Sequence, residues 1–206
     1  MSEAAVSTHM KDRIIQAATR LFADQGFAAT SVQAIADAVG IRKPSLLYHF
    51  GSKEELRQAV LENMLLHWKE DLPRVLAAAQ RGRDRLNAVL TAMIDFFIEE
   101  PHRAKLLVRE MLDRPDAMRK LFRKHLHPWT SLLTDYIRMG QEAGRVHLDL
   151  DPESYVIQVV TMAVGTVATG NVTAAMLGAT WAEPVESQIK ELVRIARCAL
   201  FTPRPT

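Results

Sequence analysis

Residues 31–53, SVQAIADAVGIRKPSLLYHFGSK, decide the fold of this chain, because they predict two short helices joined by a tight turn. Ala36, Gly40 and Leu46 follow the spacing A-x3-G-x5-L. A small residue lets the second helix cross the first at close range, and glycine adopts the positive φ of the turn without a Cβ clash. Leu46 and Phe50 lie four residues apart and share the inner face of the second helix. The pattern predicts a helix-turn-helix, whose second helix enters the major groove of DNA.

The outer side of the second helix carries side chains suited to duplex DNA. Its basic and polar groups can contact phosphates and base edges, and Leu47 can contact a thymine methyl. We predict DNA contacts by Ser31, Gln33, Arg42, Lys43, Pro44, Ser45, Leu47, Tyr48, His49 and Lys53. The net charge of the whole chain is only +2, so the position of these groups, rather than the total charge, favours nucleic acid as the partner.

These residues resemble the N-terminal pattern of the TetR family of bacterial transcriptional regulators. The positions that fall on the pattern are Thr30, Ile35, Ala36, Val39, Gly40, Ile41, Leu46, His49, Phe50, Ser52, Lys53 and Leu56. The family commonly has tyrosine where this chain has Leu47, so the phosphate contact is transferred to Tyr48 and His49. The resemblance is specific over residues 11–60. It implies a homodimeric repressor that reads a pseudo-palindromic operator and responds to a small-molecule effector.

The length of 206 residues is sufficient for a small DNA-binding domain followed by a larger helical one. We place the helix-turn-helix domain at residues 1–55 and an effector-binding and dimerisation domain at residues 56–206. Cys198 is the one cysteine, so no internal disulfide can form, which suits a reducing cytoplasm. The first dozen residues lack a continuous apolar run, and we therefore expect no secretory signal and a cytoplasmic protein.

Apolar residues recur at helical spacing along the chain, and no segment has a convincing strand pattern. We therefore predict an all-α fold, with a first helix near residues 11–25 and later helices near 84–99, 102–113, 116–142, 152–179 and 184–201. Ser52 and Glu55 predict a capping box that starts the helix after the reading pair, and Pro73 bends or ends that helix. Pro128 predicts a kink in the helix at 116–142.

The stretch from residue 154 to residue 182 contains no charged residue, which raises the alternative of a membrane span. Its threonines and glycines dilute the apolar character and no basic flank brackets it, so we expect no membrane partner and a helix buried on several sides instead. In proteins of the family resembled above, the last two long helices pair with those of a second subunit. The residues predicted to form this dimer interface are Val160, Ala163, Val167, Gly170, Ala174, Ile189, Leu192, Val193 and Ala196. The alternative is that one of the two stripes belongs to the core within the chain.

Methionine and aromatic residues gather on the helices of the second domain. Flexible thioethers and flat rings favour an adaptable pocket for an apolar or aromatic molecule, although each residue taken singly also suits a core. The predicted effector contacts, with Tyr136 and Thr166 as polar groups, are Met93, Phe96, Phe97, Leu107, Met111, Phe122, Trp129, Leu133, Tyr136, Met162 and Thr166. The sequence does not identify the small molecule.

No motif for catalysis or cofactor binding is present. The histidines form no helical pair suited to a metal, and there is no nucleophile elbow and no phosphate-binding glycine loop. We therefore expect no enzymatic activity, no cofactor and no metal. Two alternatives remain: a helical DNA-binding dimer that responds to no effector, and an all-α enzyme that uses the apolar cavity.

Overall fold

The computed structural model describes residues 3–78, 82–178 and 182–202. Over these residues the chain forms helices, and its one β-type pairing is an isolated bridge between Val146 and Phe201. In chain order the helices are α1 (Glu3–Gln25), α2 (Val32–Val39), α3 (Lys43–His49), α4 (Lys53–Ala78), α5 (Gly82–Glu99), α6 (Pro101–Asp113), α7 (Pro115–His125), α8 (His127–Glu142), α9 (Pro152–Thr173), the 3-10 turn η1 (Ala174–Leu177) and α10 (Ala182–Leu200). The predicted all-α fold is confirmed.

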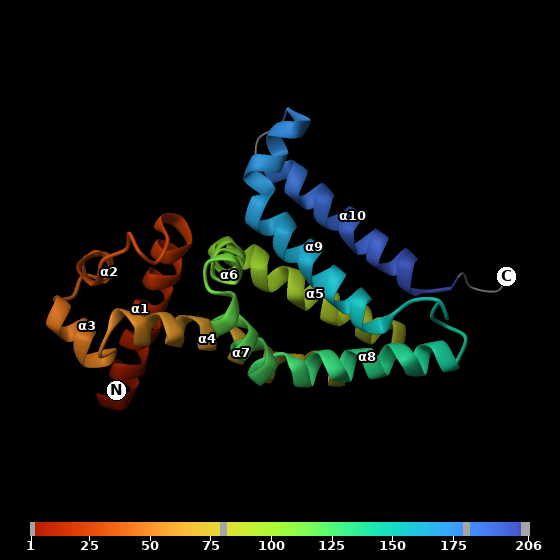
Figure 1. Cartoon of the computed structure of the whole chain (residues 1–206), viewed down its shortest axis with the longest axis horizontal. Helices are drawn as coiled ribbons and strands as arrows, with labels where there is room; N and C mark the ends of the chain where they lie inside the picture. The colour runs from red at the N-terminus through yellow and green to blue at the C-terminus, as the bar shows by residue number, and fades with distance from the viewer. Residues whose placement is uncertain (1–2, 79–81, 179–181, 203–206) are drawn as a thin grey trace.

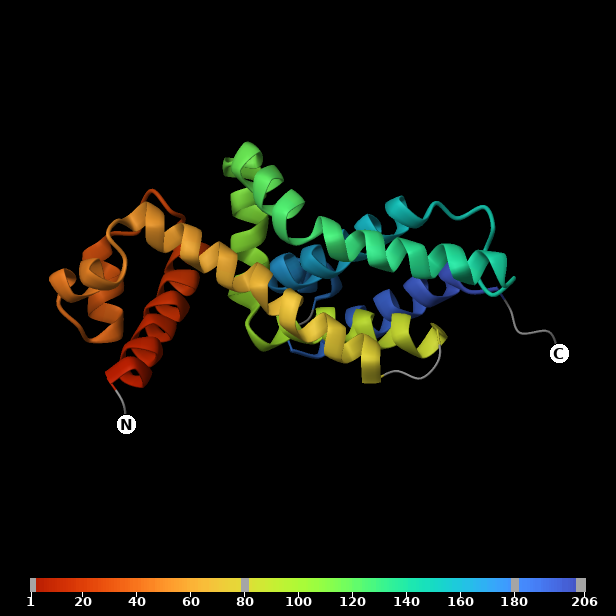
Figure 2. The ribbon, with the colours of Figure 1, turned by 90° about the horizontal axis from the view of Figure 1, so that it is seen from below.

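The molecule has a small head and a longer helical body (Figures 1 and 2). The head consists of α1, α2, α3 and the start of α4, and α4 continues from it along the body. In the body, α9 packs against α5, α6, α8 and α10. One cluster of buried apolar residues runs from Ile14 in α1 to Ala196 in α10. The head and the body are therefore joined by a shared core, and the domain boundary predicted at residues 55 and 56 falls inside α4.

Several helix boundaries differ from the predicted ones. The expected helix at 116–142 is two helices, because Pro128 has no N–H to donate to the carbonyl four residues earlier and the chain turns at Leu126 instead. Pro128 then lies in the first turn of α8, where an N–H is not needed. The helix that starts at Lys53 continues past position 73 to Ala78, so that proline does not end it. α1 begins at Glu3, eight residues earlier than predicted.

A buried ion pair connects α4 to α6. The Arg57 guanidinium donates to the Glu110 carboxylate at 2.6 Å, and both side chains are almost fully buried. Arg57 also donates to Glu54, whose carboxylate accepts from Arg114 at 3.0 Å. Because a charge removed from water is stable only with a partner, each of these groups constrains the position of the other. The pair therefore fixes the first turns of α4 against the last turns of α6.

A second set of polar contacts connects the end of α1 to α6. Asp24 accepts from His102 Nε2 at 3.2 Å and from Lys105 at 3.5 Å, while Arg20 donates to Glu100 at 3.0 Å. Glu100 also contacts the other ring nitrogen of His102, at 2.7 Å. Burial alone would raise the pKa of Glu100, but the hydrogen bonds from His102 and Arg20 outweigh it and lower the pKa below its ordinary value. The ionised carboxylate thus favours the contact between head and body, and this contribution is lost only as the pH falls through that lowered pKa.

We expect Glu110→Ala to destabilise the protein strongly, because it leaves the Arg57 charge buried with Glu54 as its remaining partner. Removal of one member of a buried pair costs about 3 kcal/mol, at the lower end of the usual range because Glu54 remains. Urea titration measures the free energy of unfolding. As a control, Asp116→Ala breaks the exposed pair between Asp116 and Arg119 and is expected to have almost no effect. Equal losses in the two variants would contradict the role assigned to the buried pair.

Candidate nucleic-acid interface and apolar cavity

Local hydrogen bonds determine the angle between α2 and α3. Ser31 is the N-cap of α2, since its hydroxyl accepts from the Ala34 N–H at 3.0 Å. At the other end Gly40 adopts φ +78°, and its N–H donates to the Asp37 carbonyl while the Ile41 N–H donates to the Ala36 carbonyl. This double closure is a Schellman motif, which requires a residue tolerant of positive φ. The turn glycine predicted from the A-x3-G spacing has the predicted conformation.

The start of α3 and the start of α4 are each stabilised by residues that lie nearby in the sequence. α3 begins with Pro44 in its first turn, and Leu46 is fully buried beneath it. Ser52 accepts from the Glu55 N–H at 3.1 Å, and Glu55 accepts in return from Gly51, which confirms the predicted capping box with the return bond one residue earlier than usual. As a result, the side of α3 that carries Leu46 packs against the head, and the opposite side is exposed to solvent.

The predicted DNA contacts lie on that open side or at its edges. Arg42, Lys43, Pro44, Ser45 and Tyr48 are exposed, and Tyr48 has 87% of its surface accessible. Leu47 and His49 are half-buried, and the rings of Tyr48 and His49 meet edge to face at 5.6 Å. Within the described residues neither Arg42 nor Lys43 has a hydrogen-bond or ion-pair partner. Both cations are therefore available to an anionic backbone.

Three of the predicted contacts have partners inside the chain. Ser31 caps α2, as described above, and Gln33 donates to Asp37 at 2.7 Å. Lys53 donates to the Ala28 carbonyl at 3.4 Å and lies 4.2 Å from the centre of the Phe27 ring. If any of these three side chains contacts DNA, it either gives up its bond within the chain or makes the DNA contact in addition to that bond.

An apolar cavity of about 110 Å³ lies in the body, and we call it the central cavity. Five helices contribute to its walls: α4, α5, α6, α8 and α9. The lining residues are Met64, Leu65, Val89, Met93, Phe96, Phe97, Leu107, Leu126, Trp129, Thr130, Leu133, Val156 and Val160. The polar groups in this set are the Trp129 indole N–H and the Thr130 hydroxyl, which donates to the His127 carbonyl. The cavity therefore suits an apolar molecule rather than one that requires hydrogen bonds.

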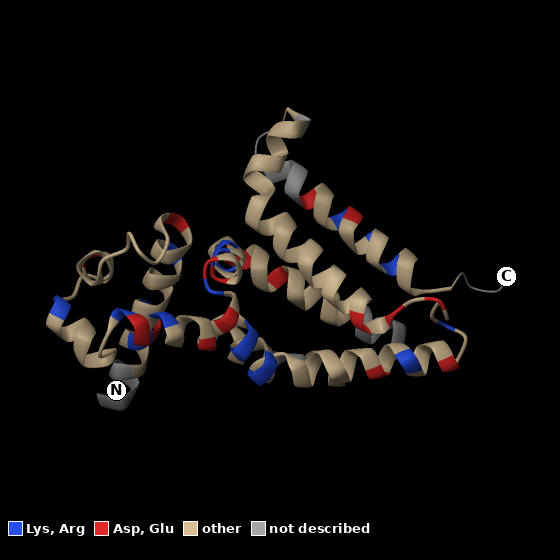
Figure 3. Ribbon diagram, in the orientation of Figure 1, with Lys and Arg blue, Asp and Glu red and all other residues tan. Residues whose placement is uncertain are grey.

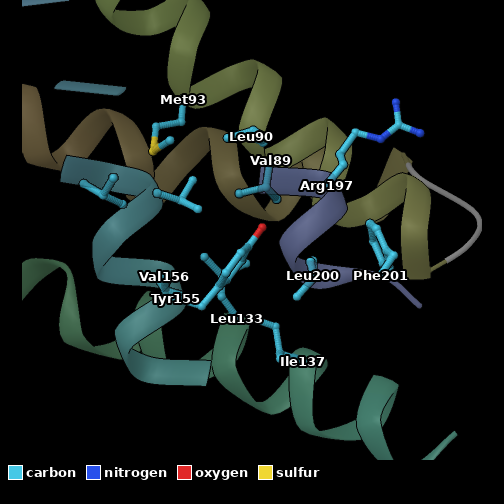
Figure 4. Close-up of a pocket in the computed structure, with 12 residues that line it drawn as sticks. Val89, Leu90, Met93, Leu133, Ile137, Tyr155, Val156, Arg197, Leu200 and Phe201 are labelled. Carbon is cyan, nitrogen blue, oxygen red and sulfur yellow. The ribbon is translucent and has the colours of Figure 1, made fainter. Parts of the chain in front are cut away.

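A second cavity of about 60 Å³, the side cavity, adjoins the first (Figure 4). The two share the lining residues Val89, Met93, Leu133, Val156 and Val160. The side cavity extends toward α10, where Leu200, Phe201 and Arg197 complete its wall, and Tyr155 projects into it. Burial raises the pKa of Tyr155 to about 12, and its hydroxyl donates to the Ala196 carbonyl at 2.9 Å. The two cavities are therefore neighbours with shared walls, and both are mainly apolar.

Six of the eleven predicted effector residues line the central cavity: Met93, Phe96, Phe97, Leu107, Trp129 and Leu133. The other five are outside the lining of both cavities: Met111, Phe122, Tyr136, Met162 and Thr166. Met111 has 44% of its surface exposed, whereas Phe122 and Met162 pack on the main core. The lining residues with polar groups that the sequence prediction did not include are Thr130, Tyr155 and Arg197.

The predicted dimer residues lie mainly inside a single subunit. Ala163, Val167 and Gly170 are buried on the inner side of α9, Ala174 is buried at the start of η1, and Leu192 and Ala196 are buried on the inner side of α10. Val160, Ile189 and Val193 are partly buried and pack against the same core. Side chains packed in this way have little surface left for a second subunit. The predicted stripes therefore lie mainly on the faces of the two helices that pack within the chain. The sequence analysis had kept this possibility as an alternative for one of the two stripes.

The opposite face of α9 is exposed and uncharged. Ile157, Thr161 and Val172 lie on it, and Val172 has 69% of its surface exposed; Met176, in the following turn η1, is also exposed. Figure 3 shows that α9 has no Lys, Arg, Asp or Glu beyond its first turn. By length and composition the segment Pro152–Met176 could also cross a membrane, but in the fold it packs against four helices of the body.

Sequence reasoning missed the residues that connect head and body, Arg57 and Glu110 among them. Glu110 follows Leu106 and Leu107 on the buried side of α6, and a carboxylate within an apolar stripe is a signal that a buried partner exists. The partner itself could not be read from the sequence, because it lies 53 residues away on another helix. Over the described residues, no group of three or more His, Cys, Asp or Glu side chains is arranged to hold a metal ion.

Two family models match the chain. Residues 14–60 match the family described as bacterial regulatory proteins, tetR family, and residues 83–193 match a family described as a tetracyclin repressor-like C-terminal domain. Similar curated proteins include the transcriptional repressor KstR2 of Rhodococcus jostii, which is 31% identical over 69% of this chain and 71% of its own length. Another is the negative regulator IcaR of the biofilm operon icaADBC from Staphylococcus epidermidis, 26% identical over 71% of this chain and 76% of its own.

Solved structures agree in fold. The ketosteroid transcriptional regulator KstR2 of Mycobacterium tuberculosis has a TM-score of 0.74 at 18% identity, covering 94% of this chain and 95% of its own. A regulator from Saccharomonospora viridis, determined in complex with choline, has a TM-score of 0.71 at 17% identity, covering 95% of this chain and 100% of its own. These relatives are DNA-binding transcriptional regulators and not enzymes. Since the C-terminal family model alone spans more than half of the sequence, the chain belongs to the TetR family of transcriptional regulators.

Proposed function

We propose that the protein is a cytoplasmic homodimer that represses transcription by binding a pseudo-palindromic operator, and that an apolar or aromatic small molecule in the central cavity releases it. The observation that carries this proposal is that the same two helices wall the cavity and hold the head. α4 contributes Met64 and Leu65 to the cavity, and α6 contributes Leu107. One turn or two away along each helix, Arg57 and Glu110 join α4 to α6.

A ligand in the central cavity acts on the head through these helices. Filling the cavity presses on Met64, Leu65 and Leu107, and these displacements reach the Arg57–Glu110 pair and the contact between α1 and α6. Only a ligand with different affinities for the two head positions changes operator affinity, and operator DNA then changes ligand affinity by the same factor.

The DNA contacts proposed for α3 follow from exposure and charge. Arg42 and Lys43 supply cations without partners among the described residues, and Tyr48 supplies a phenol hydroxyl that faces solvent. We propose that these side chains, with Ser45 and His49, contact phosphates and base edges, and that a dimer spaces two such helices about one turn of DNA, roughly 34 Å, apart.

For the DNA interface, we expect Lys43→Ala and Tyr48→Ala to weaken operator binding without changing thermal stability, since both side chains are exposed. The slope of log affinity against log salt should fall by about 0.9 for each lost phosphate contact, so Lys43→Ala should reduce it by about that amount. Fluorescence anisotropy on operator and on unrelated duplex measures both effects. Lys120→Ala on α7 is the control for a lost positive charge. A normal salt slope in Lys43→Ala would exclude a phosphate contact at this position.

For assembly, we propose that the exposed uncharged face of α9, together with Ile195 on α10, pairs with its copy in a second subunit. Val172→Asp is expected to give monomers, because it places an unpaired carboxylate in an apolar contact. Sedimentation velocity measures the change. Leu148→Asp is the matched control, because Leu148 is also an exposed leucine-sized apolar residue, with 79% of its surface accessible, but lies in the loop before α9. A Val172→Asp protein that remains a dimer would place the interface elsewhere. Leu192→Asp is unsuitable here, since Leu192 is buried and its loss would disturb the fold.

For the effector, we expect a screen of apolar and aromatic compounds to find ligands that raise thermal stability and release operator DNA. The stabilisation is about 2.7 kcal/mol at a hundredfold excess over the dissociation constant. Trp129→Ala should abolish the response and keep operator binding, whereas Met111→Ala, outside the cavity, should change neither. If ligands bind equally well with and without operator, the protein is a DNA-binding dimer that senses no effector.

A further inference from the structure

The polar side-chain groups around the two cavities are few, and two of them already have hydrogen-bond partners. The Thr130 hydroxyl donates to the His127 carbonyl, and the Tyr155 hydroxyl donates to the Ala196 carbonyl. Tyr155 is protonated at physiological pH, and burial raises its pKa further, to about 12. Neither group is left with an unused donor for a ligand. The linings also include the Trp129 indole N–H, which is a neutral donor, and Arg197, the one charged side chain in the lining of the two cavities.

Arg197 differs from the neighbouring arginines. Arg194, one turn earlier on α10, donates to Glu191 at 2.5 and 2.8 Å, and Arg138 on α8 donates to Asp135 and Glu153. Arg197 has no hydrogen-bond or ion-pair partner over the part of the chain that the structure describes. Its stem contributes to the wall of the side cavity, and the guanidinium extends outward from the lining to the exposed rim (Figure 4). The rim of an apolar cavity therefore presents an unused cation.

From this arrangement we infer that the effector is an apolar monocarboxylate whose tail fills the two cavities and whose carboxylate binds Arg197 at the rim. The inference rests on the proposed function, because it names the chemical class of the same effector. A guanidinium binds a carboxylate through two parallel hydrogen bonds, whereas it repels an ammonium group and gains little from an alcohol that water already solvates.

The cavity volumes set the length of the tail. An apolar cavity of about 150 Å³ holds one benzene ring, which is about 25 Å³ for each carbon, so the central cavity of about 110 Å³ takes roughly four carbons and the side cavity of about 60 Å³ roughly two more. The tail is therefore a medium-length chain, or a small ring on a short chain, of roughly six or seven carbons, which is the tail length of octanoate. Its methylenes contact Met93, Leu133 and Val160, which line the cavities, and the head group leaves the apolar space beside Tyr155.

The test compares three probes of equal length and different charge: octanoate, 1-octanol and octylammonium. Dissociation constants are measured by calorimetry on the full-length protein at neutral pH, and operator release by fluorescence anisotropy. Octanoate is expected to bind most tightly and octylammonium most weakly. Arg197→Gln should weaken octanoate about tenfold, a change of 1.4 kcal/mol, and should leave 1-octanol unaffected. Arg197→Lys should restore part of the loss, and the paired Arg194→Gln should behave as the unmodified protein.

The outcomes separate the two levels of the proposal. If 1-octanol binds as tightly as octanoate and Arg197→Gln alters neither, the carboxylate inference is overturned while an apolar effector in the central cavity still stands. If none of the three probes binds to a protein sample that still binds operator DNA, the inference of a medium-length tail is overturned as well. If octanoate binds but Arg194→Gln weakens it as much as Arg197→Gln does, the contact is a general effect of positive charge on α10, and the site assigned to Arg197 is wrong.

Discussion

The structure depends on one buried ion pair, Arg57 with Glu110. Two charges without water are stable only at a fixed separation, and these two belong to the helix that leaves the head and to the helix that receives the end of α1. Apolar contacts alone tolerate small sliding between helices, because dispersion is weakly directional. The ion pair does not tolerate such sliding, and it therefore determines how α4, α6 and the head are positioned relative to one another. The central cavity lies directly beyond it on the same two helices.

The reading head could be predicted from the sequence because its determinants are local. A cap, a turn glycine and an inward leucine act within a few residues of their own position, and Ser31, Gly40 and Leu46 do so here. The same holds for the all-α fold, since helical periodicity is a short-range pattern. Even the break at Leu126 follows from a single proline, although the sequence indicated a kink rather than two helices.

The effector site and the subunit contact were harder to predict because both depend on which helix faces which. Phe97 and Trp129 line the cavity, but Met111 and Phe122 have the same chemistry and do not. On α9, small and apolar residues occupy both faces, so composition does not distinguish Ala163, which is buried in the chain, from Thr161, which is exposed. The absence of charge from the helix beyond its first turn was the informative signal, because a helix covered on one side only would ordinarily carry charge on the other.

The continuity of α4 has a mechanical consequence. The helix has no break between Lys53 and Ala78, so its segments on either side of Arg57 turn together. Met64 lies seven residues beyond Arg57, about 10 Å along the axis, and a sideways displacement of 1 Å there rotates the helix by roughly 5° about the ion pair. Each head of a dimer would turn with its own α4. Under the proposed function, a ligand that displaces Met64 would thereby change the angle of the head, and the register between two α3 helices on DNA would change with that angle.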